Sequence, residues 1–188
     1  RGWDALAAAP LELHIEQIER TNPQTNAVVK KRYEAARQEA DAADLKVQSG
    51  GELPAFHGVP CPIKECFPFT GMPQSSGLVA RRDVIAEAAA TAVARIRAAG
   101  AIPLGVTNTS ELCMWMESVN NVYGRTNNPY DVGRIVGGSS GGEGAVIASG
   151  ASPFGLGSDV GGSIRGPAFF KGIFGHKPTG GLLPNTGQ

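Results

Sequence analysis

The chain has 188 residues, of which 41% are hydrophobic and 6% aromatic, so it has the length of one globular domain and enough apolar material for a core. The number of Lys and Arg residues equals the number of Asp and Glu residues, at 17 each. The sequence has no run of basic residues of the kind that binds a phosphate backbone, so direct nucleic-acid binding is not expected. The apolar stretches are shorter than the roughly 20 residues that cross a bilayer and no signal peptide is recognised, so we expect a soluble, cytoplasmic protein, with a membrane anchor upstream of Arg1 left open.

Two helices are predicted in the first 50 residues. Apolar side chains recur at helical spacing over residues 11–18, just after Pro10, and Asn22-Pro23 is expected to end this helix. The second helix is predicted from about Arg32 to Gln48 and ends at Gly50-Gly51. Because it has few large apolar residues, we expect it on the surface.

The segment 56–67 surrounds a lysine with apolar residues. Pro60 and Pro62 make a regular central strand difficult here, since proline cannot donate to a ladder. The apolar neighbours nevertheless predict that Lys64 is buried or half-buried.

Helices and strands alternate in the remainder of the chain. The patterns predict a helix over 87–99, a strand over 101–107, a short helix over 110–115, a helix over 144–149 and a strand over 154–157. This alternation predicts an α/β fold with a largely parallel sheet.

The three cysteines, Cys61, Cys66 and Cys113, are an odd number without a C-x-x-C pair, which argues against a disulfide framework. His57 with Cys61 and Cys66 could suggest a metal site, but a fourth ligand and a known zinc spacing are missing. We therefore predict buried thiols, no metal and no cofactor.

A loop of glycines and serines at 137–142 has several interpretations. A phosphate-binding loop would need a Lys after the glycines, where Glu143 stands instead. A G-x-S-x-G pattern surrounds Ser139, and Asp159 and His176 follow in the order that an α/β-hydrolase esterase requires. A tight glycine turn without chemistry is the third alternative, and all three stay open at this point.

A second loop, at 157–165, places Ser163 directly after two glycines. Consecutive backbone N–H groups in such a loop can converge on one point. If Ser163 attacks an acyl carbonyl, the N–H groups of Val160, Gly161 and Gly162 form an oxyanion hole, where each donor stabilises the transition state by roughly 3–4 kcal/mol.

A serine nucleophile needs a base. The chain has three histidines, His14, His57 and His176, and the sequence around each of them gives no sign of a catalytic role. A Ser/Lys arrangement is the remaining option, and Lys64 fits it if burial keeps its amine uncharged. Glu65 would oppose this if its carboxylate pointed the same way.

Three separated motifs, at Gly58–Glu65, Gly137–Gly142 and Gly157–Ala168, resemble the amidase signature family, and the similarity runs from about Asn22 to the last residue. The resemblance implies an amidase-signature fold with a mixed, largely parallel central sheet flanked by helices. It also implies that residues 1–188 are the N-terminal portion of a single amidase domain.

The resemblance further implies a catalytic triad of Lys64, Ser139 and Ser163. Ser163 is then the nucleophile, Ser139 a relay serine in a cis peptide, and Lys64 the base; the two serines are 24 positions apart, as the family pattern requires. Four residues are expected to support these loops, and they are Ser140, Ser158, Asp159 and Arg165. A pair of Asp159 with Arg165 would brace the nucleophile loop.

The activity implied is hydrolysis of a small-molecule carboxylic amide, through an acyl-enzyme, to an acid and an amine or ammonia. Segments 111–115 and 168–178, with Glu143, are similar to fatty-acid amide hydrolases, which favours a fatty-acyl amide. The alternatives are an amidotransferase A-type subunit, which needs partner subunits and glutamine, and a non-catalytic binding module. A homodimer and membrane contact are left open.

Overall fold

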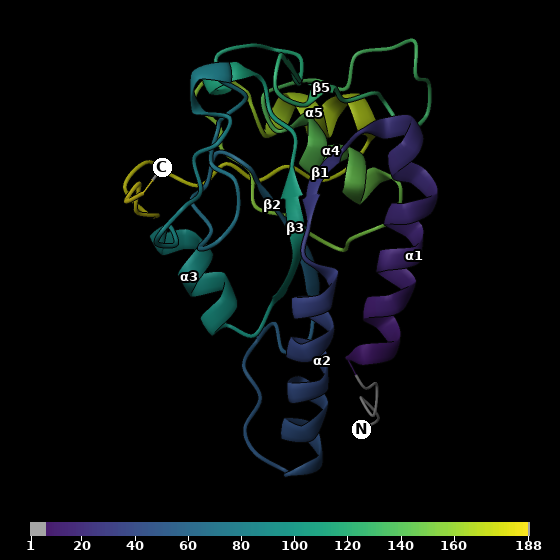
Figure 1. Cartoon of the computed structure of the whole chain (residues 1–188), viewed down its shortest axis with the longest axis vertical. Coiled ribbons are helices and arrows are strands. Elements are labelled where there is room, and N and C mark those ends of the chain that lie inside the picture. The colour runs from purple at the N-terminus through teal and green to yellow at the C-terminus, as the bar shows by residue number, and fades with distance from the viewer. Residues whose placement is uncertain (1–6, 188) are drawn as a thin grey trace.

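The structure is a computed structural model that describes residues 7–187. Residues 1–6 and 188 of the expected domain lie outside the described part. Helices and strands alternate along the chain (Figure 1), in the order α1 (Ala8–Thr25), β1 (Val28–Lys31), α2 (Tyr33–Gln48), β2 (Pro60–Lys64), a 3₁₀ turn (Val79–Arg81), α3 (Thr91–Ala98), β3 (Ile102–Thr107), a 3₁₀ turn (Glu111–Cys113), β4 (Val119–Asn120), β5 (Gly124–Arg125), α4 (Gly141–Ala148) and α5 (Arg165–Lys171).

The described sheet has three strands in the order β1-β3-β2. β2 runs parallel to β3, and β1 runs antiparallel to it. Every residue of β2 and of β3 is buried, which is typical of strands with packing on both faces. The α/β class with a mixed sheet is therefore confirmed.

Helices α1 and α2 lie side by side, and α3 lies across the sheet from α1 (Figure 1). The predicted apolar face of α1 is buried, since Leu11, Ile15 and Ile18 are each at most 4% exposed. They pack with Leu104 of β3 in one core cluster. The helical spacing thus positions α1 against the sheet.

The end of α1 differs from the expectation at Asn22-Pro23. The helix continues through Pro23 to Thr25 and ends where Asn26 adopts a left-handed conformation with φ of 47°. The N–H of Asn26 donates to Asn22 O at 2.8 Å. Asn tolerates this conformation and so ends the helix.

The segment around Lys64 forms a regular strand, contrary to expectation. Its ladder with β3 shifts register between Cys61 and Pro62, and β2 is an outer strand of the three-stranded sheet. An outer position and a bulge are the places where a sheet accepts proline, so Pro60 and Pro62 are accommodated.

The predictions for α2, β3 and α4 are confirmed in kind, although α3 begins at Thr91 instead of residue 87. The helix expected over 110–115 is wrong, because Leu112 and Cys113 have φ of 49° and 59° and allow only a 3₁₀ turn. The strand expected over 154–157 is reduced to one isolated bridge between Leu156 and Ile63.

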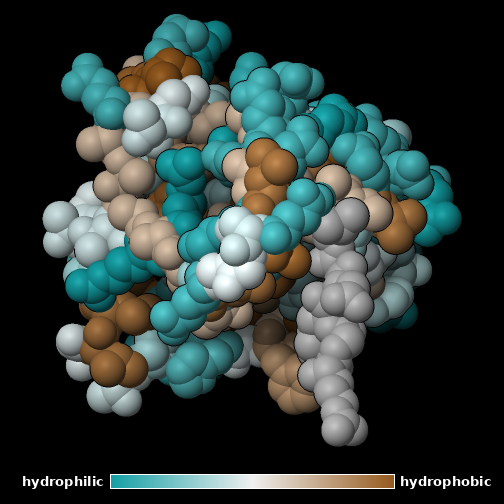
Figure 2. All heavy atoms as spheres, turned by 90° about the horizontal axis from the view of Figure 1, so that it is seen from below, coloured by the Kyte–Doolittle hydropathy of each residue, from teal (hydrophilic) through white to brown (hydrophobic). Residues whose placement is uncertain are grey.

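The surface seen from below mixes hydrophilic and hydrophobic side chains without a continuous apolar face (Figure 2). Within residues 7–187, no helix combines the length and the apolar character needed to cross a membrane.

Candidate active site

The carboxyl end of β2 places Lys64 in the interior. Lys64 is the last residue of the strand and is 0% exposed. Its Nζ donates to Ser139 Oγ at 2.5 Å and to Ser158 Oγ at 2.9 Å. These two serines come from the two glycine–serine loops, so one buried amine joins loops that are far apart in the sequence.

The first loop holds Ser139 at the start of α4. The Gly138–Ser139 peptide bond is cis, and Ser139 is 0% exposed. A Cβ at Gly138 would lie 2.6–2.8 Å from backbone atoms of residues 115–117, so only glycine permits this close approach. Ser118 Oγ donates to the carbonyl oxygens of Gly137 and Ser139 at 3.1 and 3.0 Å and fixes the loop from the other side.

The second loop is organised by Asp159. The Arg165 guanidinium donates to both carboxylate oxygens of Asp159 at 3.0 Å, and the backbone N–H groups of Gly162, Ile164 and Arg165 donate to it at 2.7–3.1 Å. The guanidinium and these N–H groups hold the pKa of Asp159 well below its ordinary value. Asp159 and Arg165 therefore form an ion pair within this loop, and their role in bracing it stays a prediction.

Backbone and side-chain hydrogen bonds between the two loops bring Ser163 next to the Ser139–Ser140 segment. The N–H of Ser140 donates to Ser163 O at 3.1 Å, and Ser140 Oγ donates to Ser158 O at 3.2 Å. Ser163 is half-buried. Across residues 7–187 its hydroxyl makes no hydrogen bond to Ser139 or Lys64, so the structure joins two members of the predicted triad directly and brings the third alongside.

The expected oxyanion donors are arranged unequally. Val160 is 98% exposed and Gly161 is also exposed. The N–H of Gly162, in contrast, is engaged by Asp159 Oδ1. This conformation therefore leaves the Gly162 N–H inside the loop, where it braces Asp159 instead of facing a substrate.

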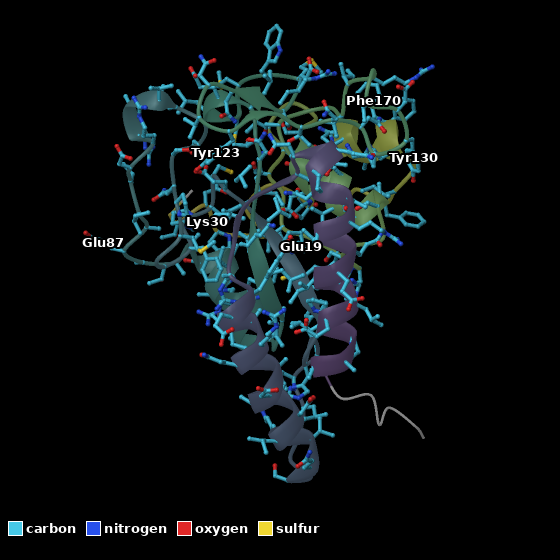
Figure 3. All side chains as sticks on the ribbon, turned by 45° about the vertical axis from the view of Figure 1, so that its right-hand side comes forward. Glu19, Lys30, Glu87, Tyr123, Tyr130 and Phe170 are labelled. Atoms are coloured by element: carbon cyan, nitrogen blue, oxygen red, sulfur yellow. The ribbon has the colours of Figure 1, made fainter. Side chains whose placement is uncertain are left out.

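The carboxylate of Glu65 points away from Lys64. The sequence alone did not determine this direction. Its carboxylate accepts hydrogen bonds of 2.6–2.8 Å from Ser75 N, Ser75 Oγ, Ser76 N and Tyr123 OH; Figure 3 shows Tyr123 in the upper half of the molecule. Burial raises the pKa of Glu65, although these donors oppose the change. The alternation of side chains along a strand is the signal that could have predicted this direction.

A second buried carboxyl, Glu143, lies under the first loop. It is 4% exposed, and Thr107 Oγ1 donates to its Oε1 at 2.7 Å. Within the described part of the chain, its Oε2 has no hydrogen-bond partner. Burial raises the pKa of Glu143 to about 8.

The histidine-dependent alternative has no matching geometry. His176 is exposed, whereas Ser139 is fully buried, and no hydrogen bond joins them among residues 7–187. His57, which the metal alternative invoked, contacts Ala43 O at 3.0 Å, and the described residues contain no group of three or more His, Cys, Asp or Glu side chains able to hold a metal.

Comparison with known proteins gives consistent relatives. A family model described as Amidase matches residues 9–188. The chain is 56% identical over 185 residues to fatty-acid amide hydrolase 2 of Homo sapiens, covering 95% of this chain but 35% of that protein. It is 38% identical over 173 residues to the A-type subunit of the glutamyl-tRNA(Gln) amidotransferase of Cyanothece sp., covering 92% of this chain and 36% of the relative.

Among solved structures, an inhibitor-bound complex of an s-triazine catabolic enzyme superposes with a TM-score of 0.94 at 41% identity. The match covers 97% of this chain and 40% of that one. The chain therefore spans little more than a third of the length of these relatives.

Proposed function

Because the chain belongs to the Amidase family, we propose that it carries the triad of an amidohydrolase that cleaves a carboxylic amide to an acid and an amine or ammonia. The observation that carries the proposal is the 2.5 Å hydrogen bond from the fully buried Lys64 Nζ to Ser139 Oγ. The chain covers 35% of the length of fatty-acid amide hydrolase 2, so the activity is proposed for the whole protein.

In the proposed mechanism, Ser163 attacks the amide carbonyl carbon. Its proton passes to Ser139 Oγ while the proton of Ser139 passes to the uncharged Lys64 amine. When the C–N bond breaks, Ser139 returns a proton to the leaving nitrogen. Water then attacks the acyl-enzyme, and Ser163 is released. The short Lys64–Ser139 contact supports this relay, and substrate binding is expected to bring the Ser163 hydroxyl into line with it.

The developing oxyanion is proposed to lie against the N–H groups of Val160 and Gly161. Both residues are exposed on the nucleophile loop. Gly162 contributes a third donor only if its N–H leaves Asp159, with which it is bonded here at 2.7 Å. The main role we propose for Asp159 and Arg165 is to hold the loop so that these donors face the substrate.

We propose a fatty-acyl amide as the substrate class. The support is the 56% identity to fatty-acid amide hydrolase 2, compared with 38% to the amidotransferase relative. The alternative is glutamine hydrolysis in a multi-subunit amidotransferase, and the lower identity to that relative makes it the less favoured of the two.

We also propose that residues 1–188 are the N-terminal portion of one amidase domain. The longer relatives support this, since they match 95% of the chain with 35% of their own length. The apolar side chains of Val160, Phe169 and Phe174 are at least 83% exposed, and exposed apolar groups of this kind mark surfaces that another part of a protein covers.

The test compares release of ammonia by the whole protein from a long-chain primary amide and from glutamine. We expect release from the fatty amide, and its loss by a factor of roughly 10³ or more in Ser163→Ala, because the acyl-enzyme cannot form. Ser49→Ala, at an exposed serine, is the matched control and should keep full activity. Absence of fatty-amide hydrolysis, or full activity in Ser163→Ala, would contradict the proposal.

A further inference from the structure

Two free thiols lie against the Lys64–Ser139–Ser158 cluster, and the proposed mechanism does not use them. Cys66 follows Lys64 by two residues and is buried. Cys113 belongs to the 3₁₀ turn Glu111–Cys113 and is half-buried. Both pack in the same core cluster, so the fold brings together two cysteines that are 47 positions apart in the sequence.

The contacts of the two thiols place them at the catalytic cluster. Cys66 Sγ lies 3.9 Å from Ser158 Oγ, the hydroxyl that accepts from Lys64 Nζ. Cys113 Sγ lies 3.4 Å from Thr109 Oγ1. Within their shared core cluster the two thiols are near enough that each shifts the pKa of the other, and Ser139 also affects the pKa of Cys113.

The environment makes the two sulfurs unequal. The neighbouring Cys66 thiol lowers the pKa of Cys113, whereas the pKa of Cys66 is raised by Cys113 and by burial. The thiolate is the form that reacts with oxidants. Cys113 is therefore the accessible attacking thiol, and Cys66 is the neighbour that can resolve the product.

We propose that Cys66 and Cys113 form a reversible oxidation site for hydroperoxides, and that their disulfide switches off the proposed active site. Cys113 Sγ attacks a peroxide oxygen, so that the O–O bond breaks and a sulfenic acid and one water form. Cys66 Sγ then attacks the sulfenic sulfur, the S–O bond breaks, and a second water leaves with the Cys66 proton. In total, two thiols and one hydrogen peroxide give one disulfide and two waters.

The disulfide would remove the Cys66 thiol contact to Ser158 and would tie the segment after Lys64 to the 3₁₀ turn beside Ser139. Both changes act on the partners of Lys64 Nζ. The loss of activity rests on the proposed function, whereas formation of the disulfide does not, because it can be measured on an inactive protein.

The experiment treats the whole protein with hydrogen peroxide and maps its thiols by mass spectrometry. Amide hydrolysis is measured before treatment, after it, and after dithiothreitol. We expect a Cys66–Cys113 cross-link with a loss of two hydrogens, a fall in activity of tenfold or more, and recovery with dithiothreitol.

Three variants separate the possible outcomes. Cys66→Ser and Cys113→Ser should each abolish the cross-link and the reversible loss, while Cys61→Ser should keep both, because Cys61 is fully buried and burial raises its pKa. If peroxide leaves Cys66 and Cys113 reduced, or links either one to Cys61, the oxidation site is refuted. If the cross-link forms and activity is unchanged, the switch is refuted and the triad is unaffected.

Discussion

At the scale of single residues, Glu143 has an uncommon environment, because one of its carboxyl oxygens is buried without a partner among the described residues. Its pKa in the folded protein is about 8, above the ordinary value of 4.5. Between these two pH values the folded state holds a proton that the unfolded chain has released. The contribution of Glu143 to stability therefore falls as pH rises from about 4.5 to about 8 and is constant above that range.

Glu143→Gln should remove this dependence, because glutamine stays neutral. Urea unfolding of both proteins at pH 5 and pH 8 is the measurement, and we expect the variant to gain about 1 kcal/mol or more over the natural chain between them. Glu87→Gln is the matched control, at an exposed carboxylate that projects from the edge of the molecule (Figure 3). A difference that is equal at both pH values would contradict the account.

Residue chemistry could be predicted from the sequence to a large extent. The family resemblance implied that Lys64 and Ser139 act together, and the short separation of Asp159 from Arg165 indicated that these two residues pair. The hydrogen bond from Gly162 N to Asp159 and the placement of Cys66 and Cys113 in one core cluster could not be predicted, since both depend on loop conformation.

At the scale of elements, the start of α4 depends on a glycine packed against backbone. A Cβ at Gly142 would lie 2.6–2.8 Å from backbone atoms of Asn108 and Ala27, whereas a Cβ at Gly166, in α5, would meet nothing within 4 Å. Backbone cannot move aside as a flexible side chain does, so a methyl group at position 142 has to displace the helix from the sheet.

We therefore expect Gly142→Ala to lower the free energy of unfolding by about 1–3 kcal/mol. Gly166→Ala, the matched control, should be neutral or stabilising by up to about 1 kcal/mol, since alanine favours the helix. Urea unfolding followed by circular dichroism measures both. Equal effects of the two substitutions would show that the close packing at Gly142 is unimportant.

Elements with a regular apolar pattern were predicted correctly. Elements that contain proline or glycine at unusual positions were not. α1 and β3 follow from regular apolar patterns. β2 was doubted because of its prolines, which an outer strand with a bulge accepts. α5 begins with Arg165-Gly166-Pro167, residues that do not favour a helix over a turn, and its formation depends on packing against α4.

At the scale of the whole molecule, the site exists because segments far apart in the chain meet above the sheet. Lys64 ends β2, Ser139 precedes α4, and Ser163 precedes α5 (Figure 1). The sequence alone contains no distance between these segments, so only the resemblance to a family could predict that they meet. The distances that then test this expectation come from the structure.

We propose that Lys64, Ser139 and Ser163 act as one catalytic unit, and a fluorophosphonate probe applied to the whole protein is the decisive measurement. The probe reacts with an activated serine, and mass spectrometry of the digested protein locates it. We predict labelling on Ser163, at least tenfold slower in Lys64→Met and absent in Ser163→Ala. Labelling on Ser139 instead, labelling that is equally fast without Lys64, or no labelling at all would contradict the account.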